Sequence, residues 1–165
     1  MVKSLAERSD ADPARIIATF LDHEVEFVII GGVAALAHGV QRITRDIDFL
    51  VEPSKANRGR AIAALVELSA EEYRPGSRNW VRISAKADPD WLLREPRLLD
   101  SAAGGVDICN AMEGVPDWPS ARAGALEVEA FGRTFMVLDK DTLIKSKLAA
   151  GREQDLADVA ELNEL

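Results

Sequence analysis

Two aspartates, Asp46 and Asp48, are separated by a single residue in the otherwise apolar segment 46–51. If this segment is a strand, its side chains alternate between faces, so both carboxylates are expected on one face, close together. Two adjacent carboxylates repel each other, whereas magnesium bound to both makes their proximity favourable. The spacing therefore predicts a metal site, and the alternative is the solvated edge of a strand.

A pair of glycines, Gly31-Gly32, ends the β-branched and aromatic run 27–30 shortly before these aspartates. Glycine lets backbone N–H groups approach a triphosphate closely, and the start of a following helix adds the positive end of its dipole. The pair is neither a dinucleotide fingerprint nor a P-loop, because no further glycine and no Gly-Lys-Ser/Thr follows. Taken alone it indicates only a tight turn.

Two arginines, Arg42 and Arg45, precede the aspartate pair. They are either phosphate contacts or neutralising surface charges. The histidines are given no catalytic role: His23 lies near a predicted helix C-terminus, and His38 precedes Gly39 in a predicted turn.

The elements that must position these residues follow from periodicity and capping signals. Predicted strands span 27–30, 44–51, 80–83, 105–109, 126–131 and 134–138, and predicted helices span 13–23, 33–38, 56–68, 140–150 and 155–162. The loop Gly132-Arg133 predicts a β-hairpin and therefore antiparallel pairing. This order favours an α/β (α+β) fold with a mixed central sheet flanked by helices over a doubly wound Rossmann fold.

The bulk composition fits one core and a cytoplasmic protein. The chain has 165 residues, 47% of them hydrophobic, so we expect a single domain over 1–165. The apolar run 27–30 is too short to span a bilayer and 1–10 lacks a signal-peptide pattern, so we expect a cytoplasmic location and no membrane partner.

The lone Cys109 excludes an intramolecular disulfide and argues against structural zinc. A net charge of −8 disfavours generic nucleic-acid binding but not a triphosphate held through metal ions.

Several of these residues together resemble the motif of the DNA polymerase beta-like nucleotidyltransferase superfamily. The residues that carry the resemblance are Gly31-Gly32, Ala35, His38-Gly39, Arg42, Thr44 and Asp46-Ile47-Asp48. The chain is most similar to small bacterial nucleotidyltransferases, including toxins of toxin–antitoxin systems, and the resemblance extends to the segment 145–158. It implies a nucleotidyltransferase fold and magnesium-dependent transfer of a nucleoside monophosphate from a triphosphate such as ATP to a hydroxyl of RNA, protein or a small molecule.

The resemblance also implies a third metal ligand. Asp107, the lone acid of the apolar segment 105–109, is the best match, although it is equally compatible with a strand end. The triad would hold two Mg²⁺ ions, one orienting the triphosphate and one activating the acceptor hydroxyl for attack on the α-phosphorus, with pyrophosphate leaving. Gly31, Gly32, Arg45 and Lys147 would bind the nucleotide, whereas Lys145 and Arg152 are equally compatible with a solvated helical face.

One difference from the superfamily motif leaves a second function open. Many active members have serine directly after the glycine of the first motif, where this chain has Gly32 and then Val33, although the toxin-like branch often carries a second glycine there. The alternative is a catalytically inactive nucleotide-binding or protein-interaction module on the same fold. A third hypothesis is an antitoxin-like protein with no site, and the toxin hypothesis implies a small antitoxin partner.

Overall fold

The computed structural model describes residues 10–93, 97–111, 113–115 and 117–165. Within them, eight strands form a mixed sheet in the order β4-β3-β5-β6-β2-β1-β8-β7. The strands are β1 (Phe27–Ile30), β2 (Asp46–Val51), β3 (Glu71–Arg74), β4 (Asn79–Arg82), β5 (Arg97–Ser101), β6 (Gly104–Cys109), β7 (Leu126–Ala130) and β8 (Arg133–Val137). The helices are α1 (Pro13–Asp22), α2 (Gly31–Ala37), α3 (Lys55–Glu67), α4 (Trp118–Gly124), α5 (Lys140–Ala150) and α6 (Glu153–Leu162), with a 3₁₀ helix, η2, at Pro89–Leu93.

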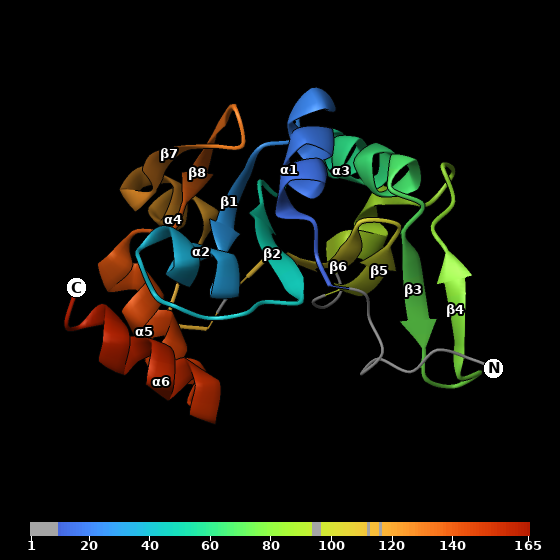
Figure 1. Ribbon diagram of the computed structural model, residues 1–165. Coiled ribbons are helices and arrows are strands. Elements are labelled where there is room, and N and C mark those ends of the chain that lie inside the picture. The colour runs from blue at the N-terminus through green and yellow to red at the C-terminus, as the bar shows by residue number, and fades with distance from the viewer. Residues whose placement is uncertain (1–9, 94–96, 112, 116) are drawn as a thin grey trace.

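The centre of the sheet is the strand that carries the aspartate pair. β2 pairs antiparallel with β1 and parallel with β6, and β1 pairs parallel with β8. The outer pairs β5–β6, β3–β5, β3–β4 and β7–β8 are antiparallel. Figure 1 shows α1 and α3 together along one side of the sheet, and α5 and α6 together near the C-terminus. The predicted mixed sheet flanked by helices is confirmed.

An aromatic cluster fixes β2 against α1 and β1. Phe20 of α1 stacks on Phe49 of β2 with ring centroids 4.3 Å apart, and Phe27 of β1 meets Phe49 edge-on at 4.9 Å. Phe49 and Ile47 are fully buried, whereas Asp46 and Asp48, which alternate with them, are half-buried. Over residues 46–49 the alternation therefore buries one face in the core and places the carboxylates on the other.

The first helix shows why several predicted boundaries are confirmed. Asp12 accepts a hydrogen bond from the backbone N–H of Arg15 at 3.1 Å, and Pro13 occupies the first helical position. Both features stabilise a helix N-terminus, since they satisfy or remove N–H groups that lack an intrahelical partner.

Several elements differ from the predictions. β3 and β5 are not among the predicted strands, because their short sequences, Glu71–Arg74 and Arg97–Ser101, carry charges at positions where an apolar alternation would signal a strand. Neighbouring strands on both sides of each supply the hydrogen bonds that hold them. α4 was also missed, although Asp117 caps it and Pro119 lies in its first turn, and α2 begins at Gly31 rather than at Val33.

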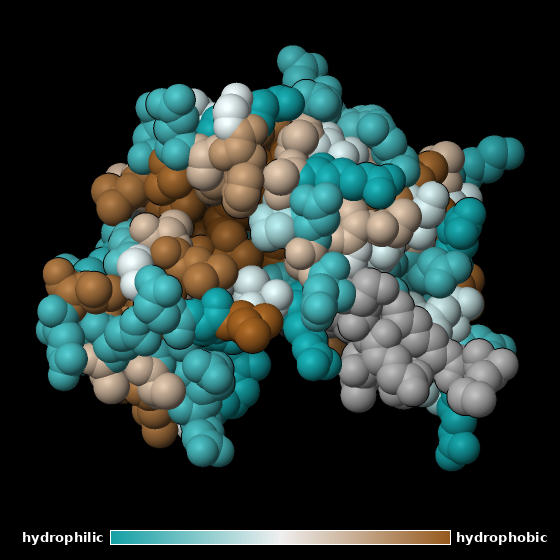
Figure 2. Space-filling view, in the orientation of Figure 1, coloured by the Kyte–Doolittle hydropathy of each residue, from teal (hydrophilic) through white to brown (hydrophobic). Residues whose placement is uncertain are grey.

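The surface facing the viewer in Figure 2 is mostly hydrophilic, with apolar residues gathered over the side of the sheet that holds β1 and β8. In the part of the chain that the structure describes, no helix combines the length and apolar character needed to cross a membrane. The single domain over 1–165 stays a prediction.

Candidate active site

Three aspartates from two adjacent strands meet on one face of the sheet. Asp48 of β2 and Asp107 of β6 are register partners, and Asp46 lies two residues before Asp48. Each of the three offers a carboxylate oxygen, and these oxygens all lie within 4.8 Å of one another. Asp107 is buried, with 8% of its surface exposed. The structure therefore brings together all three residues that the sequence nominated as metal ligands.

The first glycine of the pair is required by the closeness of Asp48. Gly31 has φ +66°, and a Cβ atom there would lie 2.1 Å from Asp48 Oδ2. A Cβ atom on Gly32 would lie 2.9 Å from Thr44 Oγ1. Both approaches are closer than non-bonded carbon and oxygen atoms tolerate, so a side chain at Gly31 would displace Asp48 or the backbone beside it, and one at Gly32 would displace Thr44.

These residues line an open cavity of about 480 Å³. The two glycines and the three aspartates contribute to its wall, and three cations from other elements join them: Arg42, Lys147 and Arg152. Carboxylates that can hold metal ions therefore share one cavity with positive side chains and a glycine-rich helix start. A polyphosphate bridged to the protein by divalent ions matches this distribution of charge.

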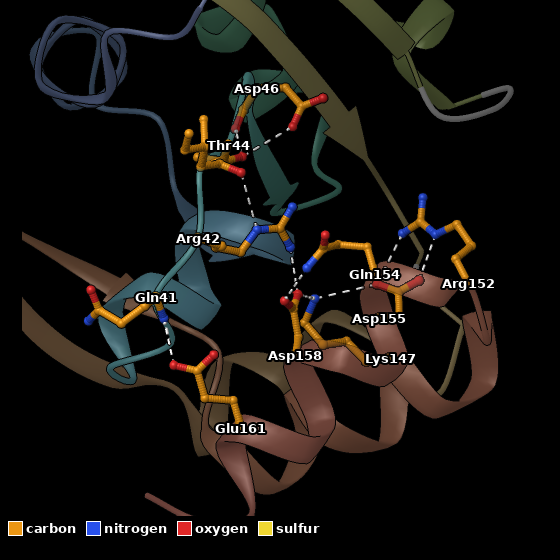
Figure 3. A network of polar contacts seen from close by, with 11 residues as sticks. Gln41, Arg42, Thr44, Asp46, Lys147, Arg152, Gln154, Asp155, Asp158 and Glu161 are labelled. Atoms are coloured by element: carbon orange, nitrogen blue, oxygen red, sulfur yellow. Dashed lines mark hydrogen bonds and ion pairs between the residues drawn. The ribbon is translucent and has the colours of Figure 1, made fainter.

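The cations are held by two buried carboxylates of α6 (Figure 3). Lys147 Nζ lies 2.6 Å from Asp158 Oδ2 and 3.4 Å from Asp155 Oδ1. Arg42 Nη1 lies 2.5 Å from Asp158 Oδ2, and Arg152 Nε lies 2.6 Å from Asp155 Oδ2. The Lys147 side chain is 4% exposed and those of Asp155 and Asp158 are 6% and 1% exposed, so these three are removed from water, whereas Arg152 is 78% exposed.

The network keeps its acids ionised. Burial by itself would raise the pKa of Asp155, but the hydrogen bond from Arg152 and the charges of Arg152 and Lys147 outweigh burial and lower this pKa. Burial likewise opposes ionisation of Asp158, and the hydrogen bonds from Lys147 and Gln154, with the Lys147 and Arg42 charges, lower its pKa overall. Both carboxylates therefore carry the negative charge that the neighbouring cations require.

The lone cysteine lies in the same cavity but is not suited to nucleophilic attack. Burial, together with the negative charges of Asp48 and Asp107, raises the pKa of Cys109 to about 12. A thiol with this pKa is protonated at neutral pH, and only the thiolate is a good nucleophile.

The remaining predicted residues are placed as follows. Arg45 does not line the cavity; its side chain is 67% exposed and its Nε lies 3.7 Å from Asp10 Oδ1. His38 Nε2 lies 2.7 Å from the carbonyl oxygen of Leu138, which agrees with a role in ordering the turn. Three polar lining residues, Glu113, Ser146 and Gln154, are not among the predicted site residues.

The comparisons with known proteins agree with this geometry. Residues 15–132 match the family model described as "Nucleotidyl transferase AbiEii toxin, Type IV TA system", where TA denotes toxin–antitoxin. No curated protein sequence matches the chain. Among solved structures, the chain is similar to the lincosamide antibiotic adenylyltransferase LnuA in its lincomycin-bound crystal structure. That similarity has a TM-score of 0.61 and 16% identity, and covers 94% of this chain and 98% of the other.

The structural similarity, at this low identity, shows the fold, and it confirms the predicted nucleotidyltransferase fold. The family match spans well over half of the chain and includes the glycine pair and all three aspartates. The chain therefore belongs to the AbiEii family of nucleotidyl transferase toxins and is a nucleotidyltransferase.

Proposed function

We propose that the chain transfers a nucleoside monophosphate from a nucleoside triphosphate to a hydroxyl acceptor in a magnesium-dependent reaction, as the toxin of a toxin–antitoxin pair. The observation that carries this proposal is the convergence of Asp46, Asp48 and Asp107, whose carboxylate oxygens lie within 4.8 Å of one another. Family membership supports nucleotidyl transfer, and the carboxylates support the metal dependence.

The donor set fits magnesium. Three carboxylates supply only hard oxygen ligands, which Mg²⁺ prefers over the softer thiolate and imidazole ligands typical of zinc. When bound, two Mg²⁺ ions would neutralise charge on the triphosphate and lower the pKa of the acceptor hydroxyl.

The chain's own residues would bind and orient the triphosphate. Gly31 and Gly32 leave room for phosphate oxygens next to the backbone. Arg42, Lys147 and Arg152 line the same cavity and place positive charge beside it. The acceptor oxygen forms a new bond to the α-phosphorus, the bond from that phosphorus to the β-phosphate oxygen breaks, and pyrophosphate leaves as the hydroxyl proton is released.

The acceptor is proposed to be RNA, a protein or a small molecule. The small-molecule option is supported by the fold neighbour, which is named for lincosamide antibiotics and was crystallised with lincomycin. The family description supports a partner antitoxin for this chain.

The test is to incubate the protein with each of the four ribonucleoside triphosphates, labelled on the α-phosphate, together with Mg²⁺ and a bacterial cell extract. Wild type should label one acceptor class, and the Asp46→Ala/Asp48→Ala variant should label none. Glu129→Gln is the matched control, because it removes an acid exposed on β7, away from the cavity. Equal labelling by wild type and the aspartate variant would overturn the proposal.

Omitting Mg²⁺ or adding EDTA should also abolish labelling. Magnesium-dependent nucleotide binding with no labelled product from any nucleotide would instead support the alternative of an inactive binding module.

A further inference from the structure

The loop that links the glycine pair to the aspartate pair is attached to α6, a helix beyond the segment matched by the family model. The backbone N–H of Gln41 donates to Glu161 Oε1 at 2.7 Å, and Arg42 pairs with Asp158 at 2.5 Å (Figure 3). Further along the loop, Thr44 Oγ1 donates to the carbonyl oxygen of Asp46 at 2.9 Å. The position of this loop therefore depends on α6.

Asp158 is the residue at which these contacts converge. Its Oδ2 accepts from Arg42 and from Lys147, at 2.5 and 2.6 Å, and its Oδ1 accepts from Gln154 at 2.9 Å. Two cations so close to one oxygen repel each other, and the carboxylate between them offsets that repulsion. Its side chain is 1% exposed, which limits the number of conformations it can adopt.

The two cations reach the cavity, whereas Asp158 does not. Arg42 and Lys147 line the cavity that holds the three aspartates, and Asp158 is absent from its lining. Arg42 comes from the loop before β2 and Lys147 from α5, so neither helix nor loop alone sets the distance between them. Asp158 can therefore act on a ligand through the side chains that it contacts, the two cations and Gln154, all of which line the cavity.

We infer that Asp158 is a positioning residue that holds Arg42 and Lys147 as a pair of ligands for the polyphosphate of the substrate. This inference rests on the proposed function, because it assigns the cationic wall of that same site to the phosphates. Charge-assisted hydrogen bonds to phosphate depend strongly on distance and direction. Fixing both cations before binding removes an ordering cost that binding would otherwise include.

Positioning and charge alone predict opposite effects of Asp158→Asn on the binding of an anion in the cavity. If Asp158 contributed only its negative charge, Asp158→Asn would strengthen the binding of an anion in the cavity. If Asp158 positions the cations, the same variant weakens binding, because Arg42 and Lys147 repel each other and separate. Loss of one charge-assisted contact corresponds to an affinity at least about tenfold lower.

The experiment measures binding of inorganic triphosphate with Mg²⁺ by titration calorimetry, which needs neither an acceptor nor turnover. Wild type should bind, and Asp158→Asn should bind at least about tenfold more weakly. Glu161→Gln is the matched control: it removes one negative charge from the same helix, while its amide oxygen still accepts from Gln41. Asp158→Asn binding as tightly as wild type, or more tightly, overturns the inference, as does wild type that does not bind.

A second variant protects the test against a folding defect, which circular dichroism would reveal. Asp158→Glu keeps the charge but lengthens the side chain. If Asp158 positions the cations, this variant should bind triphosphate more weakly than wild type, whereas a pure charge effect predicts no change in affinity. In an Arg42→Gln background the effect of Asp158→Asn should shrink, since the residue it acts through is gone. Full additivity of the two changes would contradict positioning through Arg42.

Transfer assays on the same proteins separate this inference from the proposed function. Asp158→Asn should raise KM for the nucleoside triphosphate more than it lowers kcat, whereas a general loss of structure would lower the active fraction and leave KM unchanged. Triphosphate binding that depends on Asp158 in a protein with no transfer activity would retain the inference and reject the proposed function.

Discussion

Asp48 and Asp107 lie side by side as register partners on the adjacent parallel strands β2 and β6, although they are far apart in the sequence. Parallel pairing places side chains of the same face next to each other along both strands, so one carboxylate from each strand reaches a common point. Asp46 approaches the same point because it lies two residues before Asp48 on the same face.

Magnesium should stabilise the folded protein through this triad. An ion that binds only the folded state at about one hundred times its Kd raises the free energy of unfolding by about 2.7 kcal/mol. Thermal unfolding in EDTA and in increasing Mg²⁺ measures the shift, and Asp107→Asn should remove most of it. A Tm of wild type that does not respond to Mg²⁺ would argue against the metal site.

Gly31→Ala should disrupt the site more than it disrupts the fold. The added methyl would meet Asp48 Oδ2 at 2.1 Å, and alanine at φ +66° is strained, so we expect a loss of about 1–3 kcal/mol in stability and loss of transfer. Gly59→Ala is the matched control, since Gly59 lies within α3 and nothing there lies within 4 Å of the added carbon. That control should gain about 0.5–1 kcal/mol. Transfer by Gly31→Ala at the wild-type rate would show that the close approach to Asp48 is not needed.

The aromatic cluster under β2 should control the stability of the strand that carries the aspartates. Phe49→Ala removes the stacking partner of Phe20 from a fully buried position and should cost about 3–5 kcal/mol. Phe131→Ala, at a side chain that is 58% exposed, should change the free energy of unfolding by no more than about 0.5 kcal/mol. Urea denaturation measures both, and similar losses in the two variants would contradict this account of the core.

Stability should fall in acid partly through Asp155 and Asp158. The pKa of each carboxyl is lower in the folded protein than in the unfolded chain, so the unfolded state binds more protons at acidic pH. Their contribution to the free energy of unfolding is fully present above about pH 4, the usual pKa range of an aspartate. It is lost as pH falls through the lower pKa values of the folded protein. Urea denaturation between neutral pH and pH 2.5 should show a shallower acid loss for Asp155→Asn than for wild type. An unchanged acid slope would contradict the proposed ionisation of the network.

The sequence alone determined much of the local structure and the identity of the candidate ligands. Asp12-Pro13 marked the start of α1, the apolar run at β1 marked a buried strand, and the Asp46–Asp48 spacing indicated two carboxylates on one face. These features depend on interactions between residues close in the chain, such as capping and side-chain alternation, which a single sequence displays directly.

Tertiary structure decided everything that depends on distant segments meeting. β3 and β5 form because neighbouring strands supply their hydrogen bonds, which the charges in their own sequences do not indicate. The sequence nominates Lys147 as a phosphate ligand but does not indicate its partner. The fold shows that Lys147 pairs with Asp158 and contacts the same carboxylate oxygen as Arg42. Arg42 and Lys147 meet only because α6 packs against both the loop and α5, and no local pattern encodes the packing of a helix against segments that distant.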